Sequence, residues 1–510
     1  MTLTRRRFIQ TATAAGSSLL LPACASITTP RTTEPRAVSA MADSLRNFGA
    51  AIGGAEVRFD RALPAGLEGT LYRNGPARMQ RGATTYAHWF DGDGMVQALR
   101  LKGATLEHRG ALVDTDRSRA ESAAGRFLWP GFGTTFDGAR SVRKPDDVNV
   151  ANISVLPLGG ELLALWEGGS AWRLDPDTLR TRGRKVFDAD TDGASFSAHP
   201  RVDPDGRVWN FGWASGSGKL LIYDIDRSGA LKRHALIDAP NADMVHDFAV
   251  TARHLVFVLT PVLRKTGARR DVHAFTDSLA WHPDKPVWLL VVDKDTLEVT
   301  HRAELPNFFC FHLGNAWLDG PSSLQTLRVE VVRAAPFDVL MAQIATATRG
   351  AATPRRPAAS PIEVALDLRT GRVRTTELPL PDAEFPRFDP RRTGVPTRHL
   401  LALGFDAQMP AGTFGHNTAM WFDRERGRVA TFSYGARAFA EEHVFVPRAD
   451  RSGRGREGEG WILGTALDWQ ARRTIVCVFD AQALDAGPIA TARLPYTLPM
   501  GLHGQFVAAA

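Results

Sequence analysis

Residues 155–166 read VLPLGGELLALW, two apolar runs joined by a Gly-Gly pair. Glycine adopts the left-handed backbone conformation that a tight turn needs, so this stretch predicts a β-hairpin. The same order of strand, turn and strand recurs in RVDPDGRVWNFGW (201–213) and ALDLRTGRVRTTEL (365–378), with Asp-Gly and Thr-Gly at the turns. Hairpins spread this widely along a chain favour an all-β fold.

Strand-like runs of this kind cover most of the chain, and helical periodicity is scarce. The best helix candidates are Arg119–Arg126 and Phe337–Thr346. Hairpins without a break in composition predict one β-propeller, in which radial repetition protects the strand edges, and seven blades would average roughly 65 residues each. We therefore expect a linker over residues 26–44 and a single propeller domain over residues 45–510.

Four of the fourteen histidines lie in apolar, strand-like surroundings: His199 (SFSAHPRVDP), His246 (DMVHDFAVT), His312 (FFCFHLGNAW) and His503 (LPMGLHGQF). The gaps between them are 47, 66 and 191 residues, and the last gap is close to three times the middle one. Imidazoles delivered by separate repeats predict a metal site on the propeller axis. For any single histidine the alternative is a hydrogen-bonded core residue, and the spacing leaves the metal's identity open.

The N-terminus carries an export pattern. Residues 4–10 read TRRRFIQ, which matches the twin-arginine motif, and a short apolar stretch follows from Ala12 to Leu21. We expect a signal over residues 1–25 and export to the periplasm in the folded state. The sequence ACA (23–25) fits cleavage, whereas LPAC (21–24) resembles a lipoprotein box that would leave Cys24 lipidated. A basic start before an incidental apolar run is the alternative.

The composition excludes two classes of protein. The net charge of +7 falls to +4 without the three signal arginines, and no Lys/Arg run alternates with aromatic residues, so nucleic-acid binding is not expected. A mildly basic surface suits contact with a membrane instead. Only three cysteines are present, and Cys310 and Cys477 lie in apolar runs, which excludes a disulfide framework and predicts buried thiols.

A series of motifs resembles the carotenoid oxygenase (carotenoid cleavage dioxygenase) family from about residue 45 to the C-terminus. The motifs are LEGTLYRNGP (67–76), HWFDGDGMV (88–96), ALWEGGSAWRLDP (164–176), FSAHPRVDPDG (196–206), MVHDFAVT (244–251), FHLGNAW (311–317), EFPRFDPR (384–391), VFVPR (444–448) and LPMGLHGQFV (498–507). The resemblance implies a seven-bladed propeller capped by helices and long loops. It also implies one non-haem Fe(II) per subunit, with O2 as co-substrate, held by His199, His246, His312 and His503.

The family also implies three glutamates as partners of these histidines, because a carboxylate orients a ligating imidazole and offsets the metal's charge. The implied pairs are Glu167 with His246, Glu384 with His312, and Glu457 with His503. His199 has no carboxylate partner in this scheme. Glu459 lies two residues after Glu457 and is the alternative for the third position.

The segment FLWPGF (127–132) is apolar but interrupted by proline and glycine, so it is a poor core strand. In the family this region contributes to an apolar patch at the mouth of the substrate tunnel, where a lipophilic substrate passes from a bilayer. The resemblance thus implies peripheral membrane contact and a tunnel lined by Phe127, Leu128, Trp129, Phe132 and Trp166. Buried core is the alternative for this segment.

The activity implied is Fe(II)- and O2-dependent cleavage of a conjugated C=C bond into aldehyde or ketone products. Family substrates are carotenoids and apocarotenoids in one branch and lignin-derived stilbenes in another. The stilbene branch has a lysine before the first glutamate, where this chain has Trp166, which cannot grip a phenolate in that way, so a polyene substrate is expected. Two rivals are a non-catalytic carotenoid- or lipid-binding propeller and an isomerase or ester-processing enzyme with the same metal set.

Overall fold

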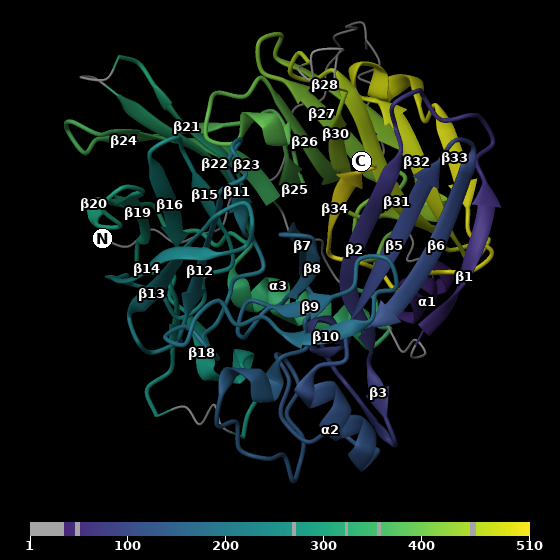
Figure 1. Ribbon diagram of the computed structural model, residues 1–510, viewed down its shortest axis with the longest axis horizontal. Helices are drawn as coiled ribbons and strands as arrows, with labels where there is room; N and C mark the ends of the chain where they lie inside the picture. Colours follow the sequence, from purple (N-terminus) through teal and green to yellow (C-terminus); the bar gives the residue numbers. More distant parts are fainter. Residues whose placement is uncertain are drawn as a thin grey trace, which may run out of the picture. The chain divides into compact units, whose positions relative to one another are not determined.

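Seven antiparallel sheets of four or five strands build the protein, arranged as a seven-bladed β-propeller in a computed structural model (Figure 1). The structure describes residues 35–45, 51–267, 272–321, 325–353, 359–448 and 455–509, and residues 33–510 form one compact unit. The predicted fold class is confirmed. The predicted signal over residues 1–25 lies outside the described residues.

The blades are numbered here in chain order, and their strands are given from the axis outward. Blade 1 contains β34 (His503–Ala508), β2 (Gly69–Arg78), β5 (Asp93–Lys102), β6 (Thr105–Leu112) and β1 (Ala51–Arg58); blade 2 contains β7 (Ser154–Leu158), β8 (Glu161–Leu165), β9 (Trp172–Leu174) and β10 (Thr181–Arg184). Blade 3 contains β11 (Arg201–Val202), β12 (Val208–Trp213), β13 (Lys219–Ile225) and β14 (Leu231–Asp238); blade 4 contains β15 (Phe248–Val250), β16 (His254–Leu259), β19 (Val287–Asp293) and β20 (Val299–Leu305).

The remaining blades follow the same plan. Blade 5 contains β21 (Leu313–Asp319), β22 (Thr326–Ala334), β23 (Ala359–Asp367) and β24 (Val373–Glu377); blade 6 contains β25 (Glu384–Arg387), β26 (His399–Gly404), β27 (Thr418–Asp423) and β28 (Arg428–Ser433). In blade 7, β29 (Ala438–Ala440) and β30 (Val444–Pro447) both pair with β31 (Gly460–Asp468), which is followed by β32 (Arg473–Asp480) and β33 (Ala490–Arg493). Two short ribbons, β3 (Gln80–Arg81) with β4 (Thr84–Thr85) and β17 (Val262–Arg264) with β18 (Leu279–Trp281), lie outside the blades.

The C-terminal strand closes the ring. β34 pairs with β2 of blade 1 in an antiparallel register that runs from Asn74 opposite His503 to Gly69 opposite Ala508 (Figure 1). β34 also contacts β7 of blade 2 and β30 of blade 7. The two ends of the propeller are therefore held together by backbone hydrogen bonds, and His503 enters the first sheet from the far end of the chain.

The three hairpins expected from the sequence are all present. β7 and β8 pair around Gly159 and Gly160, whose φ angles are 57° and 78°, and β11 pairs with β12 around Gly206, with a φ of 88°. β23 and β24 pair around Gly371, with a φ of 71°. A residue with a side chain is strained in this left-handed region, which is why the turns carry glycine.

Aromatic packing joins neighbouring blades. The ring of Phe211 in β12 lies 5.2 Å from that of Phe248 in β15 and 5.3 Å from that of Phe257 in β16, in both cases edge to face. All three side chains are fully buried. Edge-to-face aromatic pairs are worth about 0.5–1.5 kcal/mol beyond the area they bury, so these contacts help to fix blade 3 against blade 4.

Three α-helices accompany the blades in the described residues. α3 (Phe337–Thr348) contains the predicted helix Phe337–Thr346. α2 (Asp116–Ala124) overlaps the predicted Arg119–Arg126 but begins three residues earlier, because the Thr115 hydroxyl caps its first turn and Gly125 ends it in the left-handed conformation. No helix in the described ranges is long and apolar enough to cross a bilayer.

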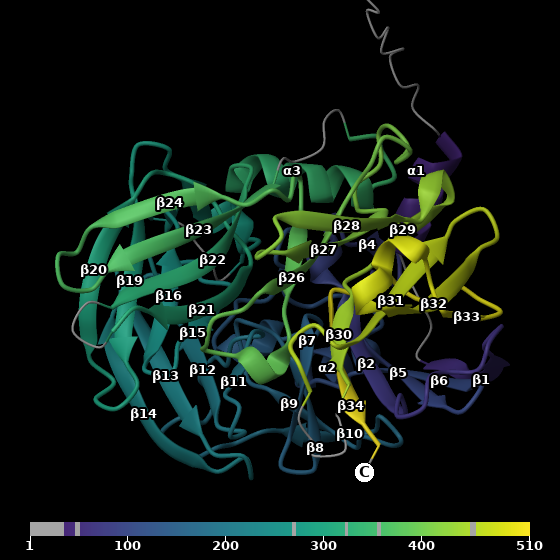
Figure 2. The ribbon, with the colours of Figure 1, turned by 90° about the horizontal axis from the view of Figure 1, so that it is seen from above.

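The third helix, α1 (Pro35–Ser44), falls inside the stretch expected to be a linker. It packs on α3 (Figure 2) and buries Ala37 and Met41 in the main apolar cluster, which Leu45, the next residue after the helix, also joins. The carbonyl of Ser44 also accepts a hydrogen bond from Met500 N at 3.1 Å. Residues 35–44 are therefore part of the folded unit, and the linker prediction was wrong for them.

Candidate metal centre

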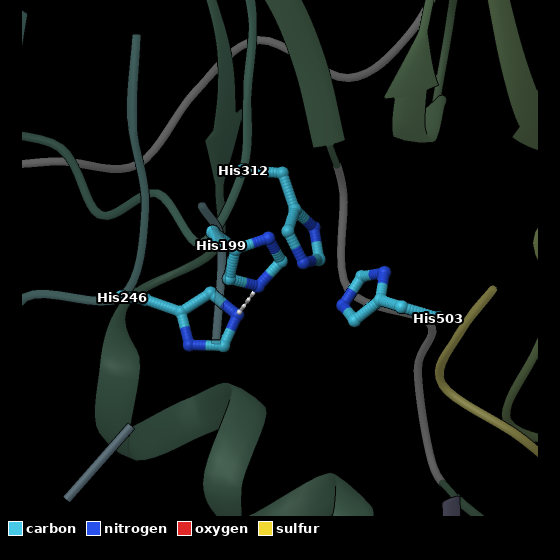
Figure 3. Close-up of side chains that lie close together, drawn as sticks. All are labelled: His199, His246, His312 and His503. Atoms are coloured by element: carbon cyan, nitrogen blue, oxygen red, sulfur yellow. Dashed lines mark hydrogen bonds between the residues drawn. The ribbon is translucent and has the colours of Figure 1, made fainter. Parts of the chain in front are cut away.

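The four histidines singled out in the sequence occupy equivalent places in four blades. His199 and His246 stand two residues before β11 and β15, His312 immediately precedes β21, and His503 is the first residue of β34. These are the innermost strands of blades 3, 4, 5 and 1. Because each side chain projects from the same end of an inner strand, the four imidazoles converge near the axis (Figure 3). The gap of 191 residues spans blades 5 to 7, which agrees with a count of three repeats.

The geometry of the cluster fits a metal ion. One ring nitrogen from each histidine lies within 4.8 Å of the others. His199 Nε2 and His246 Nε2 are 2.9 Å apart. Two imidazole nitrogens bound at right angles to one metal, at about 2.1 Å each, are separated by about 3 Å. His312 Nε2 is buried without a hydrogen-bond partner among the described residues, as expected of a nitrogen that binds a metal.

Three carboxylates orient three of the rings. His246 Nδ1 lies 2.5 Å from Glu167 Oε2, His312 Nδ1 lies 2.6 Å from Glu384 Oε2, and His503 Nδ1 lies 2.8 Å from Glu442 Oε1. A carboxylate acceptor places the ring proton on Nδ1, which leaves the Nε2 lone pair directed at the centre of the cluster. The first two pairs are those that the family resemblance implied.

The third pair corrects the sequence analysis. Glu457 does not reach His503; its Oε1 accepts hydrogen bonds from the backbone N–H groups of Arg398 and His399. Glu459 is placed in the same loop, where its backbone N–H bonds to Arg456. The carboxylate at His503 belongs to Glu442, which lies two residues before the innermost strand β30. Its signal was the Glu-Glu pair just before VFVPR (444–448), a motif already recognised in the sequence.

Glu442 is fixed from both sides. Arg387 donates to its two carboxylate oxygens at 2.8 Å each, and Gly504 N donates to Oε2 at 2.9 Å. Burial raises the pKa of Glu442, but Arg387 and His503 outweigh it and hold the pKa well below its ordinary value. The side chain is therefore a stable anion beside the histidine cluster.

Two of the four histidine rings, His199 and His503, are held in the neutral form that binds metals. Burial, and then the neighbouring histidines, place the pKa of His199 well below its ordinary value. Burial also lowers the pKa of His503 to about 4, against the opposing effect of Glu442. For His312, burial lowers the pKa but Glu384 outweighs it, so the net pKa is raised. Neutral His199 and His503 imidazoles carry the free lone pair that ligation needs.

An apolar chamber lies beside the cluster. It opens onto His246, His312 and His503, and α3 contributes Leu340 and Ile344 to its wall. The aromatic and other apolar side chains around it include Trp89, Phe90, Phe132, Trp166, Phe311 and Met500. A chamber of this composition suits an unsaturated hydrocarbon.

Comparisons with known proteins identify the group to which this arrangement belongs. A family model described as retinal pigment epithelial membrane protein, which represents the carotenoid oxygenases, matches residues 55–508. The chain belongs to the carotenoid oxygenase family. The apocarotenoid-15,15'-oxygenase of Synechocystis is 31% identical over 470 residues, with 87% of this chain and 91% of the relative covered.

Other carotenoid oxygenase relatives act on different molecules by name. The isoeugenol monooxygenase of Pseudomonas nitroreducens is 28% identical over 464 residues, with 89% of this chain and 94% of that protein covered. The lignostilbene-α,β-dioxygenase isozyme III of Sphingomonas paucimobilis is 28% identical over 481 residues, with coverages of 88% and 93%. The crystal structure of cobalt-substituted Synechocystis apocarotenoid oxygenase superposes with a TM-score of 0.82 at 26% identity and covers 94% of this chain and 100% of its own.

Two of the predicted tunnel residues line the chamber, and three do not. Trp166 and Phe132 lie in its wall. Phe127 is buried in a separate small cluster, where its ring stacks on Tyr86 with centroids 3.8 Å apart. Leu128 is also buried, and Trp129 is half-buried with Arg140 over its ring. The tunnel prediction was wrong for Phe127, Leu128 and Trp129, because this segment packs on α2 and Tyr86: Leu128 N donates to Glu121 of α2.

A second, outer cavity adjoins the chamber and is lined in part by exposed residues. The two cavities share Phe90, Phe132, Trp166 and Glu167, so these side chains lie between the outer cavity and the inner chamber. The outer cavity has a volume of about 490 Å³ and the inner chamber about 120 Å³. The inner chamber is the one that contacts the histidine cluster, through His246, His312 and His503.

Proposed function

We propose that this protein is an Fe(II)-dependent oxygenase that uses O2 to cleave a conjugated C=C bond of a carotenoid or apocarotenoid into carbonyl fragments. One observation carries the proposal: four converging histidines, three of them oriented by buried or half-buried glutamates, face an apolar chamber. Membership of a family of oxygenases supports it.

The protein's own residues have three tasks. His199, His246, His312 and His503 would hold the iron, which when bound supplies the activation of O2 that the chain's side chains cannot provide. Glu167, Glu384 and Glu442 keep the rings in the ligating tautomer and offset the positive charge of the ion. The chamber walls then position the alkene beside the cluster.

Positioning falls chiefly to aromatic side chains. Phe311 packs edge to face against His246, with centroids 4.9 Å apart, and Phe385 lies 5.2 Å from the ring of His312. Both line the chamber, so a flat conjugated chain between them would lie next to the metal-facing nitrogens. Holding two reactants in contact is a large part of catalysis when no general acid or base is needed.

Trp166 favours a polyene over a phenolic stilbene. It lies in the wall of both cavities, directly before Glu167, and offers an indole face rather than a cation. A phenolate at this position would meet an indole ring in place of a lysine ammonium group, whereas a hydrocarbon would gain contact area. Cleavage of a stilbene or phenylpropene is the second candidate, because the lignostilbene dioxygenase and the isoeugenol monooxygenase are almost as similar to this chain as the apocarotenoid oxygenase.

Product analysis tests both candidates. Fe(II)-loaded protein lacking residues 1–25 would be incubated in air with an apocarotenal and a hydroxystilbene in competition, and the products identified by mass spectrometry. We expect shortened apocarotenoid aldehydes. Benzaldehyde-type products would keep the chemistry and replace the substrate. Protein that binds no iron and yields no carbonyl product from either compound would favour a binding propeller.

We also propose that the protein is exported to the periplasm by the twin-arginine route, on the basis of TRRRFIQ (4–10) and the apolar stretch after it. A reporter fused behind residues 1–25 should reach the periplasm, and replacement of Arg5, Arg6 and Arg7 by lysine should retain it in the cytoplasm. Labelling with a radioactive fatty acid that disappears in Cys24→Ala would establish a lipid anchor. Export of the lysine variant would contradict the proposed route.

A further inference from the structure

The mouth of the outer cavity is positively charged, unlike the chamber behind it. Its exposed lining includes Arg143, Lys144, Arg264 and His273. Its two acids, by contrast, are buried and already bonded. Asp91 accepts from Gly133 N and Thr134 Oγ1, and Glu167 accepts from His246. The entrance therefore presents cations to solvent, and no acidic side chain that lines it is exposed.

Two of these cations have no counter-ion within the described protein. The carboxylate of Asp147 accepts hydrogen bonds from the backbone N–H groups of Arg143 and Lys144, and no ion pair joins either side chain to another described residue. Both side chains remain free to meet a ligand. Arginine matches the geometry of a carboxylate with two parallel N–H donors, and lysine adds a second positive charge.

A third donor lines the same cavity. Trp213, the last residue of β12, is more than nine-tenths buried, and its Nε1–H has no hydrogen-bond partner in the part of the chain that the structure describes. An indole N–H only donates. Arginine, lysine and indole together offer donors to a ligand group that accepts hydrogen bonds and carries negative charge.

We propose that the preferred substrate is a conjugated chain that ends in a carboxylate. The carboxylate remains at Arg143 and Lys144 while the apolar chain passes Phe132 and Trp166 to the histidine cluster. This inference rests on the proposed function and narrows its substrate class from neutral polyenes to polyene acids. It also sets the direction of entry, because the charged end of the molecule cannot enter the apolar chamber without losing its hydration.

Binding to metal-free protein tests this without turnover. Quenching of tryptophan fluorescence would give the Kd of an apocarotenoid acid and of the alcohol with the same chain length. We expect the acid to bind several-fold more tightly at low ionic strength and the preference to collapse in 1 M NaCl, because exposed charge pairs are screened by salt. The double substitution Arg143→Gln/Lys144→Gln should weaken binding of the acid by about 3- to 30-fold and leave the alcohol unchanged.

A matched control removes the same charge elsewhere. Lys232 and Arg374 are exposed on the outermost strands β14 and β24, so Lys232→Gln/Arg374→Gln changes the net charge equally and should leave both Kd values unchanged. Equal affinity for acid and alcohol in the parent protein would overturn the proposal. So would an equal loss of acid binding in the two double variants.

Two further outcomes distinguish this proposal from a membrane contact at the same residues and from the proposed function on which it rests. If Arg143→Gln/Lys144→Gln releases the protein from anionic lipid vesicles but leaves the ratio of acid to alcohol binding unchanged, the basic mouth is a membrane contact and the proposal fails. If an apocarotenal is cleaved at the same kcat/KM as the acid, this inference fails and the proposed function stands. Absence of any cleaved polyene product would remove the proposed function itself.

Discussion

Blades 3 to 5 carry a histidine at the start of the innermost strand, whereas blades 6 and 7 carry a glutamate there. In blades 3, 4 and 5 the start of the innermost strand carries a histidine, at His199, His246 and His312. In blades 6 and 7 the equivalent place carries Glu384 and Glu442, each of which orients a histidine from another blade. A repeat thus supplies equivalent backbone positions near the axis, and the side chain decides whether a position can bind metal or orient a ligand.

The largest effect is expected where a histidine is lost. His246→Ala should lose most of the bound iron and all measurable turnover, because three nitrogens remain and Glu167 is left buried without its partner. Iron would be measured by elemental analysis alongside product formation. His234→Ala, an exposed residue of β14, is the control and should keep both. An active, iron-replete His246→Ala would remove the ligand assignment.

Next in size is the loss of an orienting carboxylate. Glu384→Gln should weaken iron binding by about 10- to 100-fold, because the amide orients His312 without its negative charge. Glu457→Gln should leave iron binding unchanged, since that side chain bonds to the backbone of blade 6. Iron affinity is measured by competition with a chelator. Equal losses of iron affinity in the two variants would show that the loss in Glu384→Gln does not come from its contact with His312.

Glu442→Gln has a second consequence that Glu384→Gln lacks. It leaves Arg387 without the carboxylate that accepts its two hydrogen bonds. We therefore expect a lower Tm for metal-free Glu442→Gln than for metal-free Glu384→Gln, as well as weaker iron binding. Thermal unfolding of the two metal-free variants gives both Tm values. Equal Tm values would contradict the view that the Arg387–Glu442 ion pair stabilises the fold.

A smaller change in activity is expected at Trp166, which does not bond to a histidine of the cluster but directly precedes Glu167, which does. Trp166→Lys should lower kcat/KM for a polyene several-fold and admit a hydroxystilbene, because the new cation can pair with a phenolate. Iron content should not change, since Glu167 keeps its bond to His246. The measurement is kcat/KM for both substrates, and an unchanged ratio would separate Trp166 from substrate choice.

The smallest effect on function is expected at the turn that follows β7, formed by Gly159 and Gly160. A side chain on Gly159 would meet the backbone oxygen of Ser228 at 2.1 Å, whereas one on Gly160 would meet nothing within 4 Å. Both residues have positive φ, so Gly160→Ala should cost about 1 kcal/mol of stability and Gly159→Ala more. Chemical denaturation gives the two values. Iron content should be unchanged in both, because this turn lies at the opposite end of the strand from Ser154, whose hydroxyl donates to the carbonyl of Ala198 next to His199.

The sequence predicted the parts of this protein that depend on short patterns. Glycine turns predicted the hairpins at residues 155–166, 201–213 and 365–378, and apolar flanks with a regular spacing predicted which histidines converge. Glu442 was missed because the partner of His503 depends on which blade faces that ring, and no local pattern around Glu457 distinguishes it from a loop residue.

Tertiary contacts also explain the other two corrections. α1 has neither an acidic first turn nor a basic last turn, and it owes its stability to packing on α3 and on the main cluster, which a local pattern cannot show. Residues 127–132 are apolar throughout, but their side chains pack in two different places. Phe127 is buried with Tyr86, and Phe132 lines the chamber. Which side chain of this segment faces the chamber depends on the surfaces that the segment packs against, and its own sequence does not show this.

The strand that closes the ring also has a consequence for biosynthesis. Because His503 is the first residue of β34, it is the last of the four imidazoles to leave the ribosome. Docking of this strand onto β2 then joins the ends of the propeller and delivers that imidazole in a single event. A chain in which β34 has not docked therefore lacks one of the four converging imidazoles, and β2 lacks its innermost partner strand.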